Sequence, residues 1–236
     1  RCFTGIGEFQ EAIKWELKFN KIAPNNYENY ESLSFNYATL KDDRSALLWL
    51  KKAHRLEPEN AYPLVNIGFH YQNLNDFKKA LPYHLKREKI KPISAWNKRQ
   101  VGCCYQKSND FKKALKFYKS AEELEPLNIW CLTNIAWCSV KLNDNLTAQN
   151  YYEKVYEMAP DDAVNNRLFG HFLINQNKYE LALQYLLKSH QTLPSHTGAL
   201  AHIALCYENL NDYQTAILYL QKSLELDPLS ELTNMH

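Results

Sequence analysis

What this 236-residue chain lacks narrows its class. Glycine occurs only six times, which argues against a turn-rich β architecture. No apolar run reaches the ~20 residues that a membrane-spanning helix needs. The formal net charge is +2, so there is no electrostatic reason to expect nucleic acid or an acidic membrane surface as a partner. We therefore expect neither nucleic-acid binding nor membrane insertion.

Motifs of catalysis and metal binding are also missing. The sequence contains no phosphate-binding glycine loop, no HExxH and no GxSxG segment. Its six cysteines form no CxxC pair, which argues against a zinc or thioredoxin-type site. We expect free, mostly buried thiols in a reducing compartment, with a redox pair at Cys103 and Cys104 as the alternative. The prediction is no catalytic residue, no metal, no cofactor and a cytoplasmic location.

Proline and alanine instead recur at a constant spacing of 34 residues. Seven of the nine prolines keep this step: Pro24, Pro58, Pro92, Pro126, Pro160, Pro194 and Pro228. Alanine keeps the same step at Ala12, Ala46, Ala80, Ala114, Ala148, Ala182 and Ala216. Two residue types that hold one spacing along the whole chain indicate a repeat array.

The period divides the chain into units once Tyr27 is taken as repeat position 1. The six full units are 27–60, 61–94, 95–128, 129–162, 163–196 and 197–230. Residues 1–26 are then the end of an earlier unit, and residues 231–236 are a tail or the start of a further one. Because no linker or low-complexity segment separates the units, we predict a single domain over residues 1–236.

Each unit has the pattern of two helices. Apolar residues follow a helical spacing in the first half, a polar break comes next, and a second helical stripe follows. Position 15, in the break, is asparagine in five units, and asparagine tolerates the left-handed conformation that ends a helix. Lys41 replaces it in one unit, which predicts a different turn there. Asp76, Asp110 and Asp212 are predicted to cap the second helices.

These positions resemble the tetratricopeptide repeat (TPR) family over nearly the whole chain. The unit that starts at Ala95 carries its pattern of small, aromatic, alanine and proline positions at Gly102, Tyr105, Ala114, Tyr118, Ala121 and Pro126. The resemblance implies an all-α fold, a right-handed α-solenoid of antiparallel helix pairs in which the first helices line a concave groove. It also implies a non-enzymatic scaffold that holds a peptide or helix of a partner protein. Two departures are Pro82 inside a second helix, which should kink it, and Glu16 at an aromatic position.

One stripe of each first helix lies opposite the core, because a helix has 3.6 residues per turn. At position 6 of this stripe, Asn66, Gln100 and Asn134 form a series of amides in consecutive units. An amide offers both a donor and an acceptor, so such a series could bind a peptide backbone without reading its side chains. The alternative is that asparagine is simply the common residue at this repeat position.

Aromatic residues occupy other positions of the same stripe. Tyr62, Trp96 and Trp130 lie at position 2, and Phe69 and Trp137 at position 9. We predict that they anchor apolar side chains of a partner. Phe35 and Leu205, also at position 9, are instead expected to pack against a neighbouring first helix.

Charged and polar residues complete the predicted site. Arg99 and Arg167 are expected to meet an acidic group, and His171 to line the groove.

Two other functional classes stay open. One is a regulatory or substrate-docking arm of a larger enzyme or sensor whose catalytic domain lies outside this chain. The other is a self-assembly module that forms a homo-oligomer through exposed repeat ends.

Overall fold

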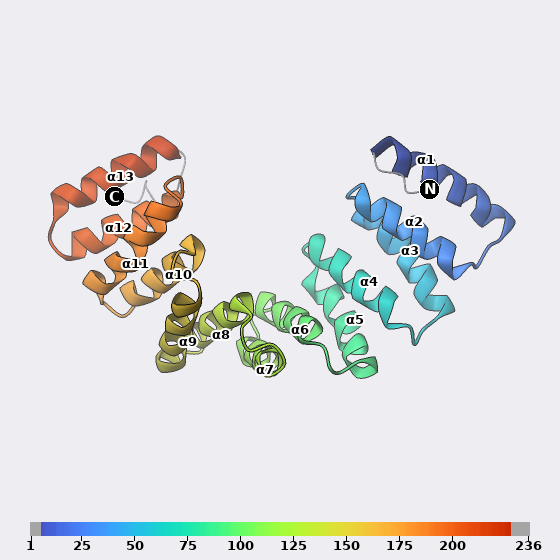
Figure 1. Ribbon diagram of the computed structural model, residues 1–236, viewed down its shortest axis with the longest axis horizontal. Coiled ribbons are helices and arrows are strands. Elements are labelled where there is room, and N and C mark those ends of the chain that lie inside the picture. The colour runs from blue at the N-terminus through green and yellow to red at the C-terminus, as the bar shows by residue number, and fades with distance from the viewer. Residues whose placement is uncertain (1–5, 228–236) are drawn as a thin grey trace. The chain divides into compact units, whose positions relative to one another are not determined.

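The computed structural model describes residues 6–227, which form helices joined by short turns and contain no strand (Figure 1). In chain order the helices are α1 (Ile6–Ile22), α2 (Tyr27–Thr39), α3 (Asp43–Leu56), α4 (Ala61–Asn73), α5 (Phe77–Ile90), α6 (Ala95–Lys107), α7 (Phe111–Glu122), α8 (Ile129–Lys141), α9 (Asn145–Met158), α10 (Ala163–Ile174), α11 (Tyr179–Thr192), α12 (Thr197–Asn209) and α13 (Tyr213–Leu226). The all-α repeat fold expected from the sequence is confirmed.

The helices follow the 34-residue period. Each full unit is one pair, from α2 with α3 to α12 with α13, and every first helix begins at repeat position 1. Helix α1 is the second helix of the partial unit and packs against α2. The repeat register read from proline and alanine therefore also fixes where each helix begins.

The turn between the helices of a pair is the same in every unit. Asn75 adopts a φ of 59° and its N–H donates to the carbonyl oxygen of Gln72 at 2.8 Å. Lys41 adopts a φ of 60° and makes the equivalent bond to Ala38 at 2.9 Å. The prediction of a different turn at Lys41 was wrong, because the surrounding helix ends impose the left-handed conformation on whichever residue stands there. The predicted aspartate caps are confirmed: Asp76 accepts a bond from the Lys79 N–H at 3.1 Å.

Lys41 consequently carries local strain that asparagine would reduce, since left-handed backbone costs most L-residues ~1–2 kcal/mol. We expect Lys41→Asn to raise the free energy of unfolding by about 0.5–1 kcal/mol. The reverse change in the next unit, Asn75→Lys, should lower it by a similar amount. Urea unfolding of both variants measures the effect, and two neutral variants would contradict it.

Close approach of the two helices of a pair depends on position 8. A Cβ atom added at Gly102 on α6 would lie 2.7 Å from Cε1 of Tyr118 on α7, so only glycine fits there without a shift. Gly68 faces His84, and Gly170 faces Leu186, in the same way. The glycines stand at repeat position 8, and Tyr118, His84 and Leu186 stand at position 24. These two positions therefore set the distance between the helices of a pair.

Glu16, the residue at an aromatic position, is hydrogen-bonded by polar side chains of α2. Both carboxylate oxygens accept bonds from the Asn36 side-chain amide, at 3.0 and 2.9 Å, and the Ser32 hydroxyl donates to one of them. The departure from the repeat pattern is thus a local exchange of apolar packing for hydrogen bonds. Helix α5 runs without interruption through Pro82, whose side chain is exposed.

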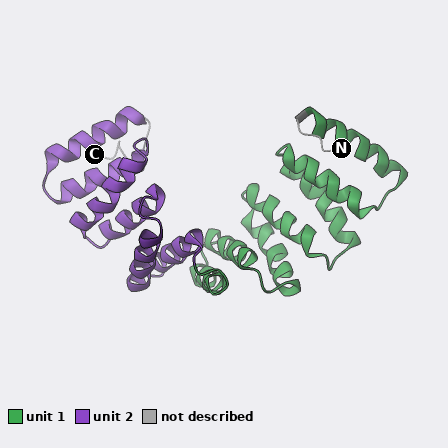
Figure 2. Ribbon diagram, viewed as in Figure 1, with its two compact units in different colours: residues 1–126 green, residues 127–236 purple. Residues whose placement is uncertain are grey.

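The helices form two compact units, residues 1–126 and residues 127–236 (Figure 2). In the first, one buried cluster consists of Ile13, Tyr30, Leu33, Trp49 and Ala53, and helices α3 to α6 supply another. In the second, a cluster from α8 to α12 is centred on Tyr152, Phe169 and Phe172. The 34-residue pattern continues unchanged across residue 126. No helix in residues 6–227 is long and apolar enough to span a bilayer.

Candidate functional site

The predicted groove residues lie on first helices of both compact units. Helices α4 and α6 of the first unit carry Tyr62, Asn66, Phe69, Trp96, Arg99 and Gln100. Helices α8 and α10 of the second unit carry Trp130, Asn134, Trp137, Arg167 and His171. Each set is a candidate surface within its own unit.

The second unit has a cleft of about 380 Å³ between α8 and α10. Its walls are formed by Ile129, Trp130, Thr133 and Asn134 on α8 and by Asp162, Val164, Asn165 and Leu168 at the start of α10. Trp130 is 47% exposed and Val164 is exposed as well, so the cleft presents apolar surface to solvent.

Polar groups inside this cleft are partly engaged with their own helices. One N–H of the Asn134 amide donates to the carbonyl oxygen of Trp130 at 2.7 Å. Its other N–H and its oxygen are therefore the groups that can pair with a bound peptide. Thr133 donates to the Asn165 side-chain oxygen at 2.8 Å and so joins α8 to α10 across the floor of the cleft.

The structure brings Trp130 and Asn134 together as predicted, and it adds residues that the sequence analysis missed. Val164 stands at repeat position 2, the same position as Trp130, so its place in the stripe was a usable signal. Asn165 gave no such signal, because its contact with Thr133 joins residues 32 positions apart.

A basic cluster lies beside this cleft in the second unit. The rings of His171 on α10 and His202 on α12 stack with centroids 4.8 Å apart. Burial lowers the pKa of His202 to about 4, helped by the positive charge of Arg167 and by His171. Burial, together with Arg167 and Lys141, also lowers the pKa of His171. Near neutral pH the charge of this cluster therefore comes from Arg167 and Lys141, with the histidines neutral.

Trp137 lies next to Lys141 of that cluster, and Arg167 of the same cluster is partly buried. The Lys141 ammonium lies 5.3 Å from the centroid of the Trp137 ring, a cation–π distance. The Nε atom of Arg167 is buried without a hydrogen-bond partner in the described chain, and burial lowers the pKa of this guanidinium. Aromatic surface and positive charge thus adjoin on α8 and α10.

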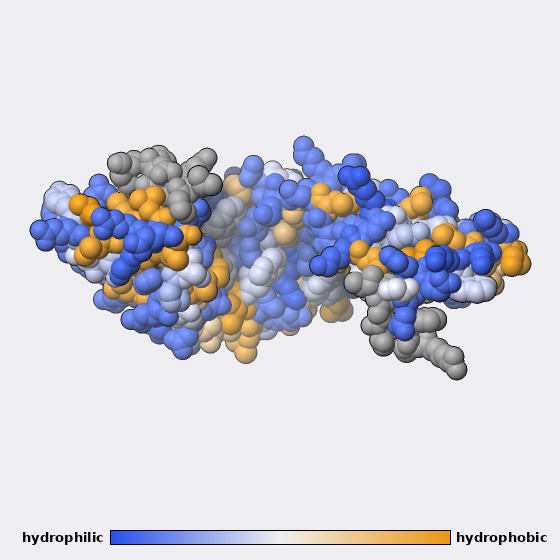
Figure 3. All heavy atoms as spheres, turned by 90° about the horizontal axis from the view of Figure 1, so that it is seen from above, coloured by the Kyte–Doolittle hydropathy of each residue, from blue (hydrophilic) through white to orange (hydrophobic). Residues whose placement is uncertain are grey.

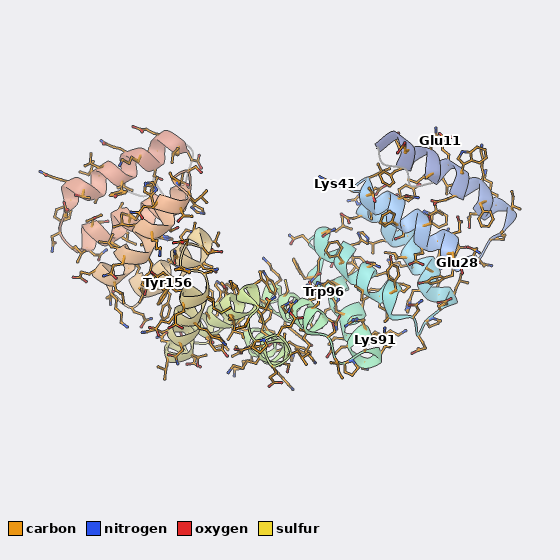
Figure 4. All side chains as sticks on the ribbon, viewed as in Figure 1. Glu11, Glu28, Lys41, Lys91, Trp96 and Tyr156 are labelled. Carbon is orange, nitrogen blue, oxygen red and sulfur yellow. The ribbon has the colours of Figure 1, made fainter. Side chains whose placement is uncertain are left out.

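In the first unit, α4 presents most of the exposed candidates. Tyr62 is 45% exposed, and Phe69, two turns further on, is similarly exposed. Asn66 lies between them and donates to the carbonyl oxygen of Tyr62 at 3.2 Å. On α6, Gln100 is half-buried. Trp96, labelled in Figure 4, is also half-buried. Its ring packs edge-on against His84 with centroids 6.1 Å apart.

Two predicted roles change in the structure, those of Arg99 and Phe35, and a third, that of Leu205, is kept. Arg99 forms an ion pair with Glu125 of the same unit and its side chain is only 11% exposed, so it is engaged within the chain instead of facing a partner's acidic group. Phe35 was expected to pack but is 59% exposed. Leu205 does pack, against the buried cluster of the second unit, as predicted.

Exposed apolar side chains form separate patches on both units, shown in orange among hydrophilic residues in Figure 3. Beside Tyr62 and Asn66 the first unit also has a cavity of about 480 Å³, lined in addition by Arg87.

The thiols offer no support for redox chemistry. Cys103, Cys104, Cys138 and Cys206 are free, and burial raises the pKa of Cys104 to about 12 and also raises that of Cys103. A thiol that stays protonated at neutral pH is a poor nucleophile. Among residues 6–227, no group of three or more histidine, cysteine, aspartate or glutamate side chains is arranged to hold a metal ion.

Family models match two parts of the sequence. Residues 100–126 match the tetratricopeptide repeat model, within the helix pair α6 and α7. Residues 143–223 match the model described as anaphase-promoting complex, cyclosome, subunit 3. The repeated helix pair of this chain is thus of the tetratricopeptide repeat type. Among curated proteins, none matches the sequence.

Solved structures share the TPR fold at low sequence identity. YrrB, described as a TPR protein with an unusual peptide-binding site, has a TM-score of 0.63 and 21% identity, covering 78% of this chain and 95% of its own. A tetratricopeptide repeat protein from Parabacteroides merdae has a TM-score of 0.74 and 14% identity, covering 97% and 90%. The APC/C hetero-tetramer Cut9–Hcn1 has a TM-score of 0.70 and 14% identity, covering 97% and 45%. This fold is that of protein–protein interaction scaffolds, which are generally non-catalytic.

Proposed function

We propose that this TPR protein is a non-catalytic scaffold that binds a peptide or short helix of a partner protein on its first helices. The observation that carries the proposal is the cleft between α8 and α10, where exposed Trp130 and Val164 stand beside Asn134. Exposed aromatic surface next to a few oriented polar groups is typical of peptide-binding sites. The peptide-binding site named for YrrB supports the proposal by analogy of fold.

Each group in the cleft has a distinct part in this binding mode. An apolar side chain of the partner would pack on Trp130, Val164 and Leu168. The free N–H and the oxygen of the Asn134 amide would pair with the backbone of the peptide, which needs both a donor and an acceptor. Arg167, with Lys141 next to Trp137, would meet an acidic group of the partner.

In the first unit the exposed stripe of α4 is the corresponding surface. Tyr62 and Phe69 would contact apolar side chains, and Asn66 retains one N–H and its oxygen for a peptide backbone. Arg99 has no part in the proposal, because Glu125 already neutralises it.

Replacing Trp130 by alanine is expected to weaken partner binding by at least about 30-fold, because buried tryptophan anchors contribute ~2 kcal/mol or more. Asn134→Ala should weaken it by about fivefold, since it removes one hydrogen bond of ~1 kcal/mol. The partner is first identified by mass spectrometry of proteins retained from source-cell lysate. Its binding segment is then made as a labelled peptide and titrated by fluorescence anisotropy.

The matched control is Leu146→Ala, which removes an apolar side chain of α9 that is more exposed than Trp130 and does not line the cleft. Circular dichroism of all three variants should match the parent. Equal affinity of the Trp130 and Leu146 variants for the peptide would refute the cleft as the binding site.

A further inference from the structure

Arg87 on α5 departs from the repeat in a way that neither packing nor the peptide cleft explains. It occupies repeat position 27. In the other five full units this position is small and buried: Ala53, Ala121, Val155, Ser189 and Ser223. An arginine side chain is too long for the space between two packed helices, so its guanidinium group has to lie outside that space.

The equivalent serines show what position 27 faces. The hydroxyl of Ser189 donates to the carbonyl oxygen of Ala163 at 2.7 Å, and that of Ser223 to Thr197 at 3.4 Å. Both acceptors are the first residue of the first helix of the same unit. Position 27 therefore points at the beginning of the partner helix, which for Arg87 is the beginning of α4 near Ala61.

A cavity of about 480 Å³ lies at that place. It is lined by Glu59, Asn60, Ala61, Tyr62, Val65, Asn66, Arg87, Ile90 and Lys91. Tyr62, Val65 and Ile90 give it an apolar wall, whereas Asn66 and Lys91 contribute polar groups. Lys91 directly follows the last residue of α5 (Figure 4). The volume fits a group of about the size of an amino-acid side chain or larger.

The guanidinium group of Arg87 is unsatisfied inside the described chain. Its Nε and Nη1 atoms are shielded from solvent and have no hydrogen-bond partner among residues 6–227. Glu59 lines the same cavity without pairing with Arg87, and the nearby Glu88 is already bonded to Asn97 and Lys98. Buried N–H donors without acceptors cost free energy, so an acceptor in the cavity would relieve this cost.

We propose that this cavity is a binding subsite for an oxyanion, a carboxylate or a phosphoryl group, held by Arg87. The planar fork of N–H donors in a guanidinium matches the paired oxygens of either group. Lys91 adds positive charge, and the wall of Tyr62, Val65 and Ile90 contacts the carbon chain that bears the anion. If the anion is part of the bound partner, this proposal rests on the proposed function. The recognised segment would then contain an acidic or phosphorylated residue.

The test uses small probes and needs no partner. The protein is titrated with N-acetylglutamate, with its neutral isostere N-acetylglutamine and with inorganic phosphate, at constant ionic strength. The N–H resonance of the Arg87 Nε, assigned through its loss in Arg87→Lys, is followed by ¹⁵N NMR. We expect a saturable shift with N-acetylglutamate or with phosphate and none with N-acetylglutamine; which probe acts distinguishes a carboxylate from a phosphoryl ligand.

Arg87→Ala is the informative variant, because alanine is the residue that two other units carry at this position and the fold should tolerate it. Its affinity for the active probe, measured by calorimetry, should fall at least about tenfold. The matched control is Arg55→Ala, which removes an exposed arginine of α3 and should bind like the parent. No shift of the Arg87 resonance with either anion, or equal binding by the parent and Arg87→Ala, would overturn the proposal.

The experiments can refute the peptide cleft and the oxyanion subsite independently of each other. A null result with Trp130→Ala and a positive Arg87 titration would leave an oxyanion site without the peptide cleft. The opposite outcome would leave the peptide cleft and exclude an oxyanion at Arg87.

Discussion

Replacing His84 by tyrosine is expected to stabilise the protein by about 2 kcal/mol at pH 7, and by more in mild acid. His84 on α5 is fully buried, and neither of its ring nitrogens has a hydrogen-bond partner. The amide of Asn97 lies nearby but donates to the carbonyl oxygen of His84, at 3.1 Å, and to Glu88. The buried imidazole therefore loses its hydrogen bonds to water on folding and gains none in return.

The next unit supplies the template for the change. There, Tyr118 stands at the same repeat position, packs over Gly102, and donates its hydroxyl to Gln106. Gly68 and Gln72 are the equivalents of Gly102 and Gln106 around His84. A tyrosine at residue 84 thus meets a glycine that admits its ring and a glutamine that accepts its hydroxyl.

The pH dependence follows from the pKa of His84, which burial lowers to about 4 from an ordinary value near 6.5. Between these values the unfolded chain binds more protons than the folded one, so stability falls as the pH drops from about 6.5 toward 4. At pH 5 this loss amounts to ~2 kcal/mol for His84. Tyrosine does not titrate in this range, so the variant should lose that part of the pH dependence, while His202 keeps its own.

Urea unfolding at pH 7 and pH 5 measures both effects. His84→Phe is the control that places an aromatic ring over Gly68 without the hydroxyl, and it should gain less than tyrosine. A tyrosine variant with the parent's stability and the parent's pH dependence would show that His84 is satisfied or solvated in the folded protein.

Adding a single methyl group at Gly170 is expected to lower the free energy of unfolding by about 1 kcal/mol, although alanine is the better helix former. A Cβ atom there would lie 2.5 Å from Cγ of Leu186 and 3.3 Å from the backbone oxygen of Ala182. The Leu186 atom is a branch point rather than a mobile end, so the side chain or the helix has to move. The cost of overpacking, ~1–3 kcal/mol, exceeds the ~1 kcal/mol gain in helix propensity.

Gly7→Ala separates the gain in helix propensity from the cost of overpacking. Gly7 also lies in a helix, α1, but nothing comes within 4 Å of a Cβ added to it, so only the propensity gain of up to about 1 kcal/mol remains. Urea unfolding should therefore show opposite signs for the two variants. A stabilised Gly170→Ala would mean that α10 and α11 can separate at little cost.

The period accounts for most of the fold. Helix starts, aspartate caps and the glycine positions all follow from residues within one unit, and each unit meets the same kind of neighbour. Lys41 shows the limit of local conformational preference. The Lys41 N–H donates to the Ala38 carbonyl oxygen and the Asp42 N–H to that of Tyr37, and these bonds hold the turn although lysine disfavours a left-handed backbone.

The candidate site was less predictable than the fold. The helical spacing correctly places Trp130, Asn134 and Tyr62 on accessible surface, because a face of a helix is a local property. It could not reveal that Glu125 neutralises Arg99, since that ion pair joins residues 26 positions apart.

The sequence by itself determined the helix pairs, their register and the stripe from which any binding residue had to come. Only the tertiary structure decided which members of that stripe remain available, and that Arg87, outside the stripe, faces a cavity with unpaired donors. The reason is physical: repeat register is encoded within each 34-residue unit, whereas the availability of a side chain depends on contacts made with residues far away in the sequence.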